Sequence, residues 1–354
     1  MGTNPHVWIL WRRRKGDLDQ MLSLVNAVGW THEIKRLEFR GPGIPALAPL
    51  LLAAGSDPLT APWPDVAMCA EALPSIIARR LKRISGGMLK TVCIGRPAGT
   101  PDAFDLVITT PQYRIPSAAN VVELSLPLSA SRADAASPPY PPVARRPLIA
   151  VLAGGASFPD RFDGKVAAQL AGDIRQYTDH KNGTMAIATS PRSGAEVNAA
   201  LERVVAPPHR LHVFGRGENR YAALLAAADE IVVTSDSVSM VADALETGKP
   251  VYVYRLPRHL GLQWHIMEWL YVRAVERRLA VLLPVKWLFD AGVFEAAADR
   301  RRLISRLAAE RRIAWFGDTP PLPQPSAAAQ DLARAAGRLR ALISPDTQAP
   351  SSGQ

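Results

Sequence analysis

Small polar residues follow a β-branched run in the second half of the chain, and their types suit the binding of an anion. Residues 231–233 are predicted to form a buried strand, and the residues after it open a short helix that Gly248 ends. A helix N-terminus at the carboxyl end of a parallel strand attracts anions, because its first N–H groups have no partner within the helix. The polar residues of this segment are Ser235, Asp236, Ser237, Ser239 and Asp243. The pattern therefore predicts a phosphate or nucleotide site.

The same residues also suit a purely structural role. Ser235, Asp236 and Ser237 can accept hydrogen bonds from the free N–H groups of the helix, as N-cap residues do. For a ligand, the hydroxyls of Ser237 and Ser239 offer donors to a phosphate, and Asp243 lies far enough along the helix to reach a ribose. Spacing alone leaves both interpretations open, a capped βαβ unit and a nucleotide pocket.

Residues 229–251 resemble the donor-binding stretch of GT-B glycosyltransferases such as the peptidoglycan N-acetylglucosaminyltransferase, in which a Ser/Thr-bearing helix and an acidic residue hold a UDP-sugar. They are more similar still to the mitochondrial fission "elongated mitochondria" (ELM-type) family, a plant factor with bacterial relatives. This resemblance covers roughly residues 7–257. It implies an α/β protein with two Rossmann-like, doubly wound domains that face a cleft. It also implies a nucleotide sugar, UDP-linked in the related enzymes, rather than a cofactor.

Three further loops in the second half of the chain match the donor side of this resemblance. The first pairs two glycines after the strand predicted at 148–152, and small residues let a backbone approach a pyrophosphate. The second carries an arginine, which can pair bidentately with a phosphate. The third lies against the base in related enzymes. A plain turn, a solvated arginine and an ordinary loop are the alternatives. The residues concerned are Gly154, Gly155, Ser190, Arg192, Phe214, Glu218 and Asn219.

The first half of the chain carries two carboxylates just after its first predicted strand, residues 7–11. Asp17 or Asp19 can take a proton from an acceptor hydroxyl, whereas a helix N-cap is the alternative role for either. In GT-B enzymes this loop faces the cleft, where it helps to bind the acceptor or to place a general base. Motifs after the strands predicted at 91–95 and 106–109 are expected to line the same cleft. The cleft-lining residues are Gly16, Gln20, Gly95, Arg96, Gln112 and Tyr113.

Two functions follow from the resemblance. The first is a metal-independent transfer of sugar from a nucleotide donor to a lipid or glycan of the cell envelope, with helix dipoles and arginine offsetting the leaving phosphate. The second is a non-catalytic peripheral membrane adaptor of the ELM type that keeps the nucleotide-binding fold. Because one fold hosts many functions, the sequence leaves open whether the chain is an enzyme. If it is one, glycosyltransferase is the expected class.

Composition indicates which partners and which cellular location to expect. Its 42 Lys+Arg exceed its 32 Asp+Glu, and this net charge of +10 favours anionic partners such as nucleotide phosphates and acidic lipid headgroups. Basic and aromatic residues do not alternate, so nucleic acid is not an expected partner. Cys69 and Cys93 lie in apolar runs and are predicted to be buried thiols, and no Cys/His spacing suits a metal. The expected location is cytoplasmic, with peripheral contact to the inner face of a membrane as an option.

Two segments suit such contact with a membrane. Residues 45–54 are apolar with basic flanks, and residues 261–287 carry Trp264, Trp269 and Trp287 among arginines. Packing in a core is the alternative for both segments. The predicted organisation is a first, acceptor-side domain at 1–130, a linker at 131–147, a nucleotide-sugar domain at 148–325, a C-terminal helix at 326–344 and a disordered tail at 345–354.

Overall fold

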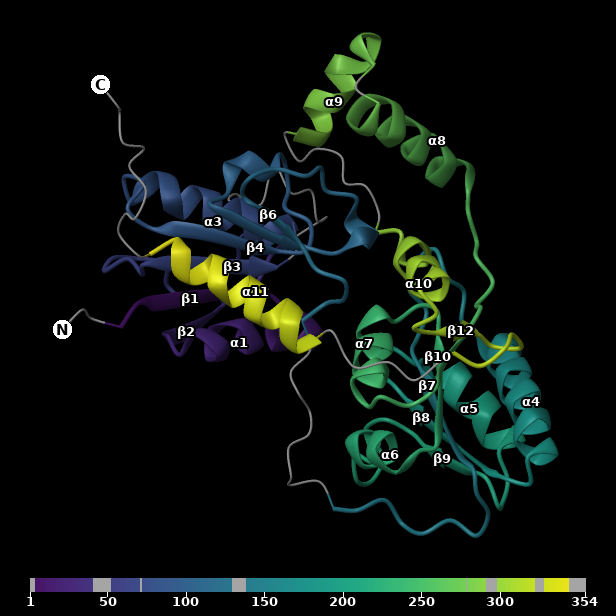
Figure 1. Ribbon diagram of the computed structural model, residues 1–354. Helices are drawn as coiled ribbons and strands as arrows, with labels where there is room; N and C mark the ends of the chain where they lie inside the picture. The colour runs from purple at the N-terminus through teal and green to yellow at the C-terminus, as the bar shows by residue number, and fades with distance from the viewer. Residues whose placement is uncertain are drawn as a thin grey trace, which may run out of the picture. The chain divides into compact units, whose positions relative to one another are not determined.

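The computed structural model describes residues 4–40, 52–70, 72–128, 138–277, 279–290, 298–321 and 328–343. These residues fall into two compact units. Unit 1 takes those within 1–130, 267–297 and 329–354, and unit 2 takes those within 131–266 and 298–328. Each unit is built on its own sheet of six parallel strands (Figure 1). The predicted α/β class with two Rossmann-like sheets is confirmed, while a cleft between the units stays a prediction.

The sheet of unit 1 has the strand order β2-β1-β3-β4-β5-β6. Its strands are β1 (His6–Trp11), β2 (Thr31–Arg36), β3 (Val66–Ala70), β4 (Lys90–Ile94), β5 (Leu106–Thr109) and β6 (Val121–Glu123). The order reverses at β1, which pairs with β2 on one side and with β3 on the other. In open α/β sheets, ligands bind beyond the carboxyl ends of the strands at such a reversal.

Helices cover both faces of this first sheet (Figure 1). They are α1 (Lys15–Val28), α3 (Ala72–Ile84) and α11 (Ala328–Ala341). On one face, Leu24 of α1 and Leu339 of α11 join the same core cluster. On the other face, Ile77 of α3 packs against the strands. Cys69 and Cys93 lie side by side in β3 and β4 as buried free thiols, as predicted.

The sheet of unit 2 has the order β12-β11-β10-β7-β8-β9. Its strands are β7 (Leu148–Ala153), β8 (Thr184–Thr189), β9 (Arg210–His212), β10 (Glu230–Thr234), β11 (Val251–Tyr254) and β12 (Ala314–Trp315). The first strand of the unit, β7, pairs with β8 on one side and with β10 on the other. The order therefore reverses between β7 and β10, and the loops after these two strands are the expected ligand-binding edge.

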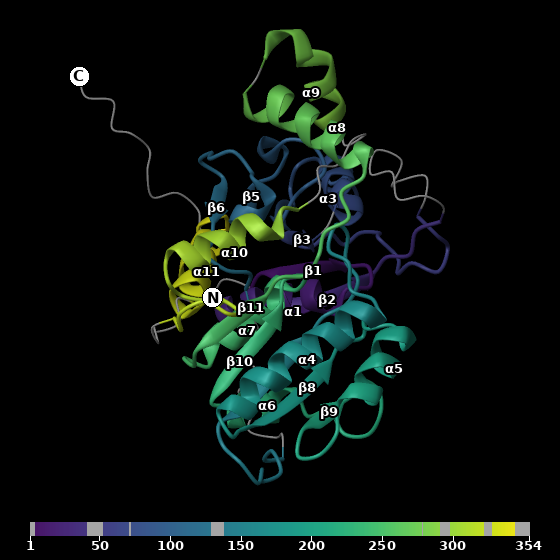
Figure 2. The same ribbon diagram turned by 90° about the vertical axis from the view of Figure 1, so that its right-hand side faces the viewer.

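Five helices of unit 2 accompany this sheet. They are α4 (Gly164–His180), α5 (Ala195–Val204), α6 (Tyr221–Ala227), α7 (Val238–Glu246) and α10 (Arg300–Ala309). α4 and α5 cover one face, where Leu170 and Leu201 join the core, and α6 and α7 lie on the opposite face (Figure 2). α4 begins after Asp163, whose carboxylate accepts a hydrogen bond from the Val166 N–H at 3.0 Å. This is the side-chain cap that starts many helices.

Two helices near the C-terminal half belong to neither sheet. α8 (Leu262–Tyr271) and α9 (Leu283–Asp290) lie side by side (Figures 1 and 2). The ring centroids of Tyr271 and Phe289 lie 5.3 Å apart, and the two side chains belong to one small core cluster. Arg114 holds α8 through a bidentate pair with Glu268, with one N–O distance of 2.8 Å. None of the described helices is long and apolar enough to cross a membrane. The apolar segment predicted at 45–54 lies mostly outside the described residues, as does the tail at 345–354.

Candidate functional site

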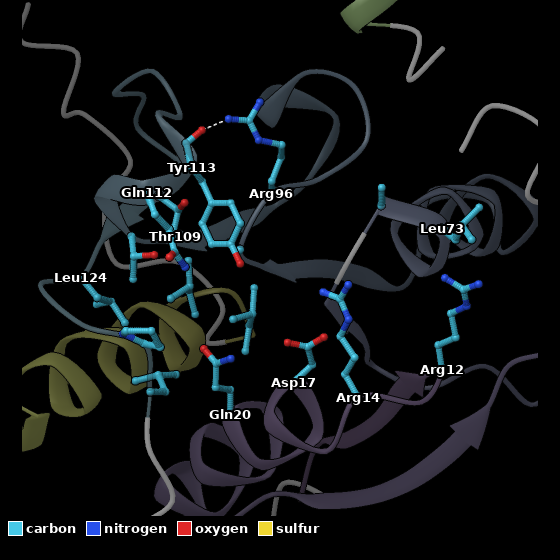
Figure 3. Close-up of a pocket in the computed structure, with 17 residues that line it drawn as sticks. Arg12, Arg14, Asp17, Gln20, Leu73, Arg96, Thr109, Gln112, Tyr113 and Leu124 are labelled. Carbon is cyan, nitrogen blue, oxygen red and sulfur yellow. Dashed lines mark hydrogen bonds between the residues drawn. The ribbon is translucent and has the colours of Figure 1, made fainter. Parts of the chain in front are cut away.

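A pocket of about 170 Å³ lies in unit 1, beyond the carboxyl ends of its strands (Figure 3). Its walls come from the loop before α1, the first turns of α1, the start of α3 and the loops after β4, β5 and β6. This is the edge at which the strand order reverses, where ligands of such sheets bind. The volume has room for roughly ten water molecules, so it admits a group of the size of a phosphate or a sugar ring.

The structure brings together six of the residues that the sequence nominated in the first half of the chain. They are Asp17, Gln20, Gly95, Arg96, Gln112 and Tyr113. Gly16 is exposed in the first turn of α1 and does not line the pocket. Asp19 pairs instead with Lys15, whose Nζ lies 3.1 Å from Asp19 Oδ1. Of the two carboxylates nominated as a base, Asp17 therefore lines the pocket and Asp19 does not.

Asp17 and Tyr113 both line this pocket, and each influences the other's electrostatics. Asp17 lies in the first turn of α1, where the helix dipole favours a negative charge. Figure 3 shows Asp17 and Gln20 rising from α1 towards the side that carries Tyr113. Burial, together with the nearby Asp17 charge, raises the pKa of Tyr113 to about 12, so the phenol stays protonated. Gly95 has a φ of +90°, and a Cβ there would lie 3.3 Å from the Tyr113 ring, which explains the glycine.

Four buried polar atoms of the pocket have no hydrogen-bond partner among the residues that the structure describes. They are Arg96 Nε, Thr109 Oγ1, Thr110 Oγ1 and Gln112 Oε1. Such atoms are rare, because a buried polar group without a partner costs about 1–3 kcal/mol. The rest of the Arg96 guanidinium is fixed, since Nη2 donates to the Tyr113 carbonyl and the group stacks 4.9 Å from the Tyr271 ring centroid. The pocket thus holds hydrogen-bonding capacity that a polar ligand would use.

Sequence reasoning did not nominate Arg12 and Arg14, which line this pocket from the loop between β1 and α1. The available signal was position, because this loop follows a strand of a parallel sheet. Thr109 and Thr110 also line the pocket, at the end of β5 and in the motif there that was expected to line the cleft. Together with Arg96, the lining contains three arginines and one aspartate. The wall is therefore electropositive on one side and rich in hydroxyl and amide groups on the other.

The residues nominated as a donor site lie in unit 2, where the carboxyl ends of β7, β8 and β10 meet. Asp236 is buried and accepts hydrogen bonds from the Gly155 N–H at 2.9 Å and the Thr234 hydroxyl at 2.6 Å. Arg192 Nη2 lies 3.0 Å from Asp236 Oδ2. One charged network therefore joins the glycine loop, the arginine loop and the turn after β10.

The two nominated glycines are required by this network. A Cβ on Gly154 would lie 2.1 Å from Asp236 Oδ2, and one on Gly155 would lie 2.3 Å from the Arg192 carbonyl oxygen. The Ser190 hydroxyl donates to the Gly154 carbonyl at 2.7 Å. These residues are close together, and the contacts between their loops already account for the absence of side chains at both glycines.

The structural alternative for Ser235, Asp236 and Ser237, that they cap α7 through their side chains, is not found in the structure. Ser237 is the N-cap residue, but its side chain makes no cap hydrogen bond. The Ser235 hydroxyl accepts a hydrogen bond from the Leu256 N–H at 3.1 Å, and the Asp236 carboxylate accepts one from the Gly155 N–H. Both side chains therefore bind neighbouring loops instead of the N–H groups of α7. The hydroxyls of Ser237 and Ser239 lie 3.3 Å apart at the start of the helix. α7 thus begins without a side-chain cap and with two hydroxyls beside its first turn.

The remaining nominated donor residues lie around α6 and α7. Asp243 accepts a hydrogen bond from the Tyr221 hydroxyl at 2.8 Å, and Asn219 accepts one from the Tyr221 N–H at 3.1 Å. Glu218 pairs with a neighbouring arginine. The Phe214 ring is 52% exposed. Asp243 and Asn219 therefore position Tyr221, while Phe214 offers an accessible aromatic face.

The family described as "Mitochondrial fission ELM1" matches residues 15–269, well over half of the chain. The chain belongs to the mitochondrial fission ELM1 family. The Mitochondrial fission protein ELM1 of Arabidopsis thaliana is 31% identical over 109 residues. That match covers 30% of this ELM1-family chain and 25% of the Arabidopsis protein, so it spans about a quarter of the length of that relative. The resemblance inferred from the motifs is confirmed.

Two solved structures are similar to this ELM1-family chain. The glycotransferase of kitacinnamycin is 13% identical, covers 96% of each chain and has a TM-score of 0.52. A complex of S. aureus MnaA with UDP is 10% identical, covers 86% of this chain and 96% of that chain, and has a TM-score of 0.48. The first comparison confirms that the ELM1-family chain has the predicted GT-B-like fold.

Proposed function

We propose that this protein binds a nucleotide sugar in unit 2 and transfers the sugar to an acceptor held in the pocket of unit 1. The observation that supports this most is a set of buried polar atoms that line the same pocket as Asp17 and have no hydrogen-bond partner among the described residues. A hydroxyl-bearing acceptor would supply partners to Thr110 and Gln112 and would present a hydroxyl to Asp17. The GT-B-like fold shared with a glycosyltransferase agrees with this function.

In the proposed reaction, the residues of the two units have separate roles. Asp17 accepts the proton of the acceptor hydroxyl, and the acceptor oxygen forms a bond to the anomeric carbon of the donor. The bond between that carbon and the phosphate oxygen breaks, and the nucleotide leaves with the electron pair. The uncapped first turn of α7, with Ser237 and Ser239, stabilises the phosphate charge in this metal-independent scheme.

Replacing Ser239 by Trp tests the donor site. Ser239 is exposed at the first turn of α7, so an indole there fills the proposed phosphate position without entering the core. Titration calorimetry with UDP and UDP-N-acetylglucosamine should show affinity lowered by about a hundredfold, the loss of one or two hydrogen bonds to a charged group. The melting temperature should not change.

A matched control for this variant is Ala199→Trp, at an exposed position of α5 in the same unit. It adds the same ring to the surface and should leave the affinity for both nucleotides unaltered. Equal affinities in the two variants would remove α7 from the proposed donor site.

A second candidate function is favoured by the surface of α8 and α9. Large apolar side chains are exposed along these helices and the turn between them, namely Leu262, Ile266, Trp269, Leu279, Val281, Leu283 and Trp287. Large exposed apolar side chains that gather in one segment are typical of interaction surfaces, and Trp rings favour lipid headgroups. Arg273 stacks 4.6 Å from the Trp269 ring centroid, which adds a cation to this surface. We propose that it rests on an anionic membrane.

The double variant Trp269→Ser/Trp287→Ser should bind anionic vesicles about a hundredfold more weakly, because each indole loses roughly 1.5 kcal/mol of burial. Flotation with phosphatidylglycerol–phosphatidylcholine vesicles measures this binding, which should also weaken as salt is added. Met88→Ser is the control, since Met88 is 74% exposed but lies elsewhere, after α3. Wild-type protein that stays with the soluble fraction would exclude the membrane function.

A further inference from the structure

We infer that unit 2 binds hydrogen phosphate at a cluster of charged side chains beyond the carboxyl ends of β7 and β11. The cluster forms where the loops after these two strands meet the start of α10. None of its members has a role in the proposed sugar transfer, so the inference goes beyond that function and is independent of it. The members are Asp160, Arg258, Asp299, Arg300 and Arg301.

The loops after β7 and β11 are held side by side through their backbones. Asp160 and Arg258 face each other in an isolated antiparallel bridge, and the Arg161 N–H donates to the Pro257 carbonyl at 2.8 Å. Residues directly opposite each other in such a bridge carry their side chains on the same face. Asp160 and Arg258 are therefore brought together by segments that lie far apart in the chain.

The first residues of α10 fasten this helix to both loops. Arg300 Nη2 donates to the Ser157 carbonyl at 2.6 Å and to the Phe158 carbonyl at 2.8 Å. Arg301 Nη2 donates to the Leu256 carbonyl at 2.7 Å. One end of each guanidinium is thus fixed by a backbone group, which leaves the rest of the guanidinium in a set position.

The charges of the cluster do not cancel, because it contains three arginines and two aspartates. Arg300 Nη2 lies 3.3 Å from Asp160 Oδ2, whereas Arg258 Nη2 lies 4.0 Å from Asp299 Oδ1, too far for a hydrogen bond. The Asp160 side chain is 2% exposed, and those of Arg258 and Arg300 are each 17% exposed. The excess positive charge therefore lies where water screens it little, and it attracts an anion.

Five polar atoms of the cluster are buried and have no hydrogen-bond partner among the described residues. Three are N–H donors, the Nε atoms of Arg258, Arg300 and Arg301. Two are acceptors, the Oδ1 atoms of Asp160 and Asp299. A buried polar group without a partner costs about 1–3 kcal/mol, so five such atoms together indicate a ligand that supplies both acceptors and donors.

The Asp160 carboxylate in particular gains from a further donor. Burial raises the pKa of this carboxyl, although Arg300, Arg258 and Arg301 act in the opposite direction. A hydrogen bond to the charged form offsets the cost of burial.

Hydrogen phosphate supplies both kinds of partner. Its charged oxygens can accept from the three Nε–H groups, and guanidinium groups match the geometry of phosphate oxygens. Inorganic phosphate keeps at least one O–H at neutral pH, which can donate to Asp160 or Asp299. Sulfate has the same shape but no proton, so it would leave both carboxylate oxygens without a donor. Asp299 makes no side-chain cap on α10, so the first N–H groups of this helix also favour the anion.

The test is calorimetric titration of the full chain with inorganic phosphate, sulfate and glycerol 3-phosphate at equal ionic strength and about pH 6, where roughly half of a phosphate monoester keeps its proton. Inorganic phosphate should bind at least about tenfold more tightly than sulfate, because sulfate leaves a buried acceptor unpaired. The tighter of inorganic phosphate and glycerol 3-phosphate identifies the source of the group, a free anion or a phosphorylated molecule.

Arg258→Lys locates the binding site. Lysine keeps the charge but lacks the Nε–H and the planar fork, so phosphate affinity should drop by about tenfold. The Arg258 side chain makes no hydrogen bond to a described residue, so the melting temperature without phosphate should not fall. Arg302→Lys is the matched control, because Arg302 is exposed in the same turn of α10, and its phosphate affinity should stay the same.

Asp160→Asn tests the role of the phosphate proton. The amide can donate to either anion, so this variant should bind phosphate and sulfate about equally well. If Asp160 served only as the ionic partner of Arg300, the variant would melt earlier, but the ratio of the two affinities would stay as in the wild-type protein.

Lack of phosphate binding by the wild-type protein, equal affinities for phosphate and sulfate, or unchanged phosphate affinity in Arg258→Lys overturns the inference. A folded Asp160→Asn variant that keeps the preference for phosphate also overturns it. If Asp160→Asn does not fold, the comparison of Arg258→Lys with Arg302→Lys still decides. All titrations are made without a sugar donor, so failure of the proposed transfer reaction would leave these results unchanged.

Discussion

Replacing Asp17 by Asn should lower sugar transfer by about 10²–10⁴-fold, the range that general-base catalysis typically contributes. Asn keeps the shape of the side chain but cannot accept a proton from the acceptor. Binding of the nucleotide sugar should survive, because the proposed donor residues belong to unit 2. Transfer is measured by the release of UDP from a UDP-sugar with the acceptor present, and donor affinity is measured separately by calorimetry.

The matched control is Asp19→Asn, two residues further along α1. Asp19 pairs with Lys15, whose side chain is 78% exposed, and such a surface pair contributes only about 0–1 kcal/mol. The transfer rate of this variant should change by less than about fivefold. If Asp19→Asn loses as much activity as Asp17→Asn, or if Asp17→Asn retains full activity, the base has been assigned wrongly.

Replacing Gly154 by Ala should lower the free energy of unfolding of unit 2 by about 3 kcal/mol, as overpacking beside a buried charge does. The added Cβ would lie 2.1 Å from Asp236 Oδ2, inside the space of a buried carboxylate. Asp236 would have to move, and its hydrogen bonds from Gly155 and Thr234 would lengthen or break. Urea unfolding followed by circular dichroism measures the change.

Gly172→Ala is the control for this variant. Gly172 lies within α4, and a Cβ there meets nothing within 4 Å. Alanine favours helix, so this variant should gain about 0.5–1 kcal/mol. If Gly154→Ala instead has the unfolding free energy of the wild-type protein and only loses nucleotide affinity, then the space beside Gly154 is needed by the ligand rather than by Asp236.

The network around Asp236 also reduces the number of residues that can contact a nucleotide in the proposed donor site. Ser190 and Asp236 are buried and engaged with the glycine loop, so their polar groups already serve the fold. Ser239 and Phe214 are exposed near the carboxyl ends of the strands, and Ser237 lies at the start of α7. The proposed contacts to a nucleotide therefore concentrate on α7 and on the loop after β9.

The sequence by itself determined the elements and their class. Apolar β-branched runs are short and bounded by turn residues, so residues 106–109 are predicted as a strand with the bounds that β5 has. Alternation of strands with helices then required parallel sheets. The two-residue strand β12 and the helix α10 before it were not predicted, because two residues cannot show a pattern and the resemblance ends before them.

Which side chains share a site was decided only by the tertiary structure. Asp17 and Asp19 are equivalent in the sequence, but residues two apart point to different sides of a helix, so one lines the pocket and the other pairs with Lys15. The missing partners of Thr109 and Thr110 were equally invisible, because a hydrogen-bond partner comes from segments distant in the chain. Local pattern sets where strands and helices form, whereas burial and pairing depend on what those elements pack against.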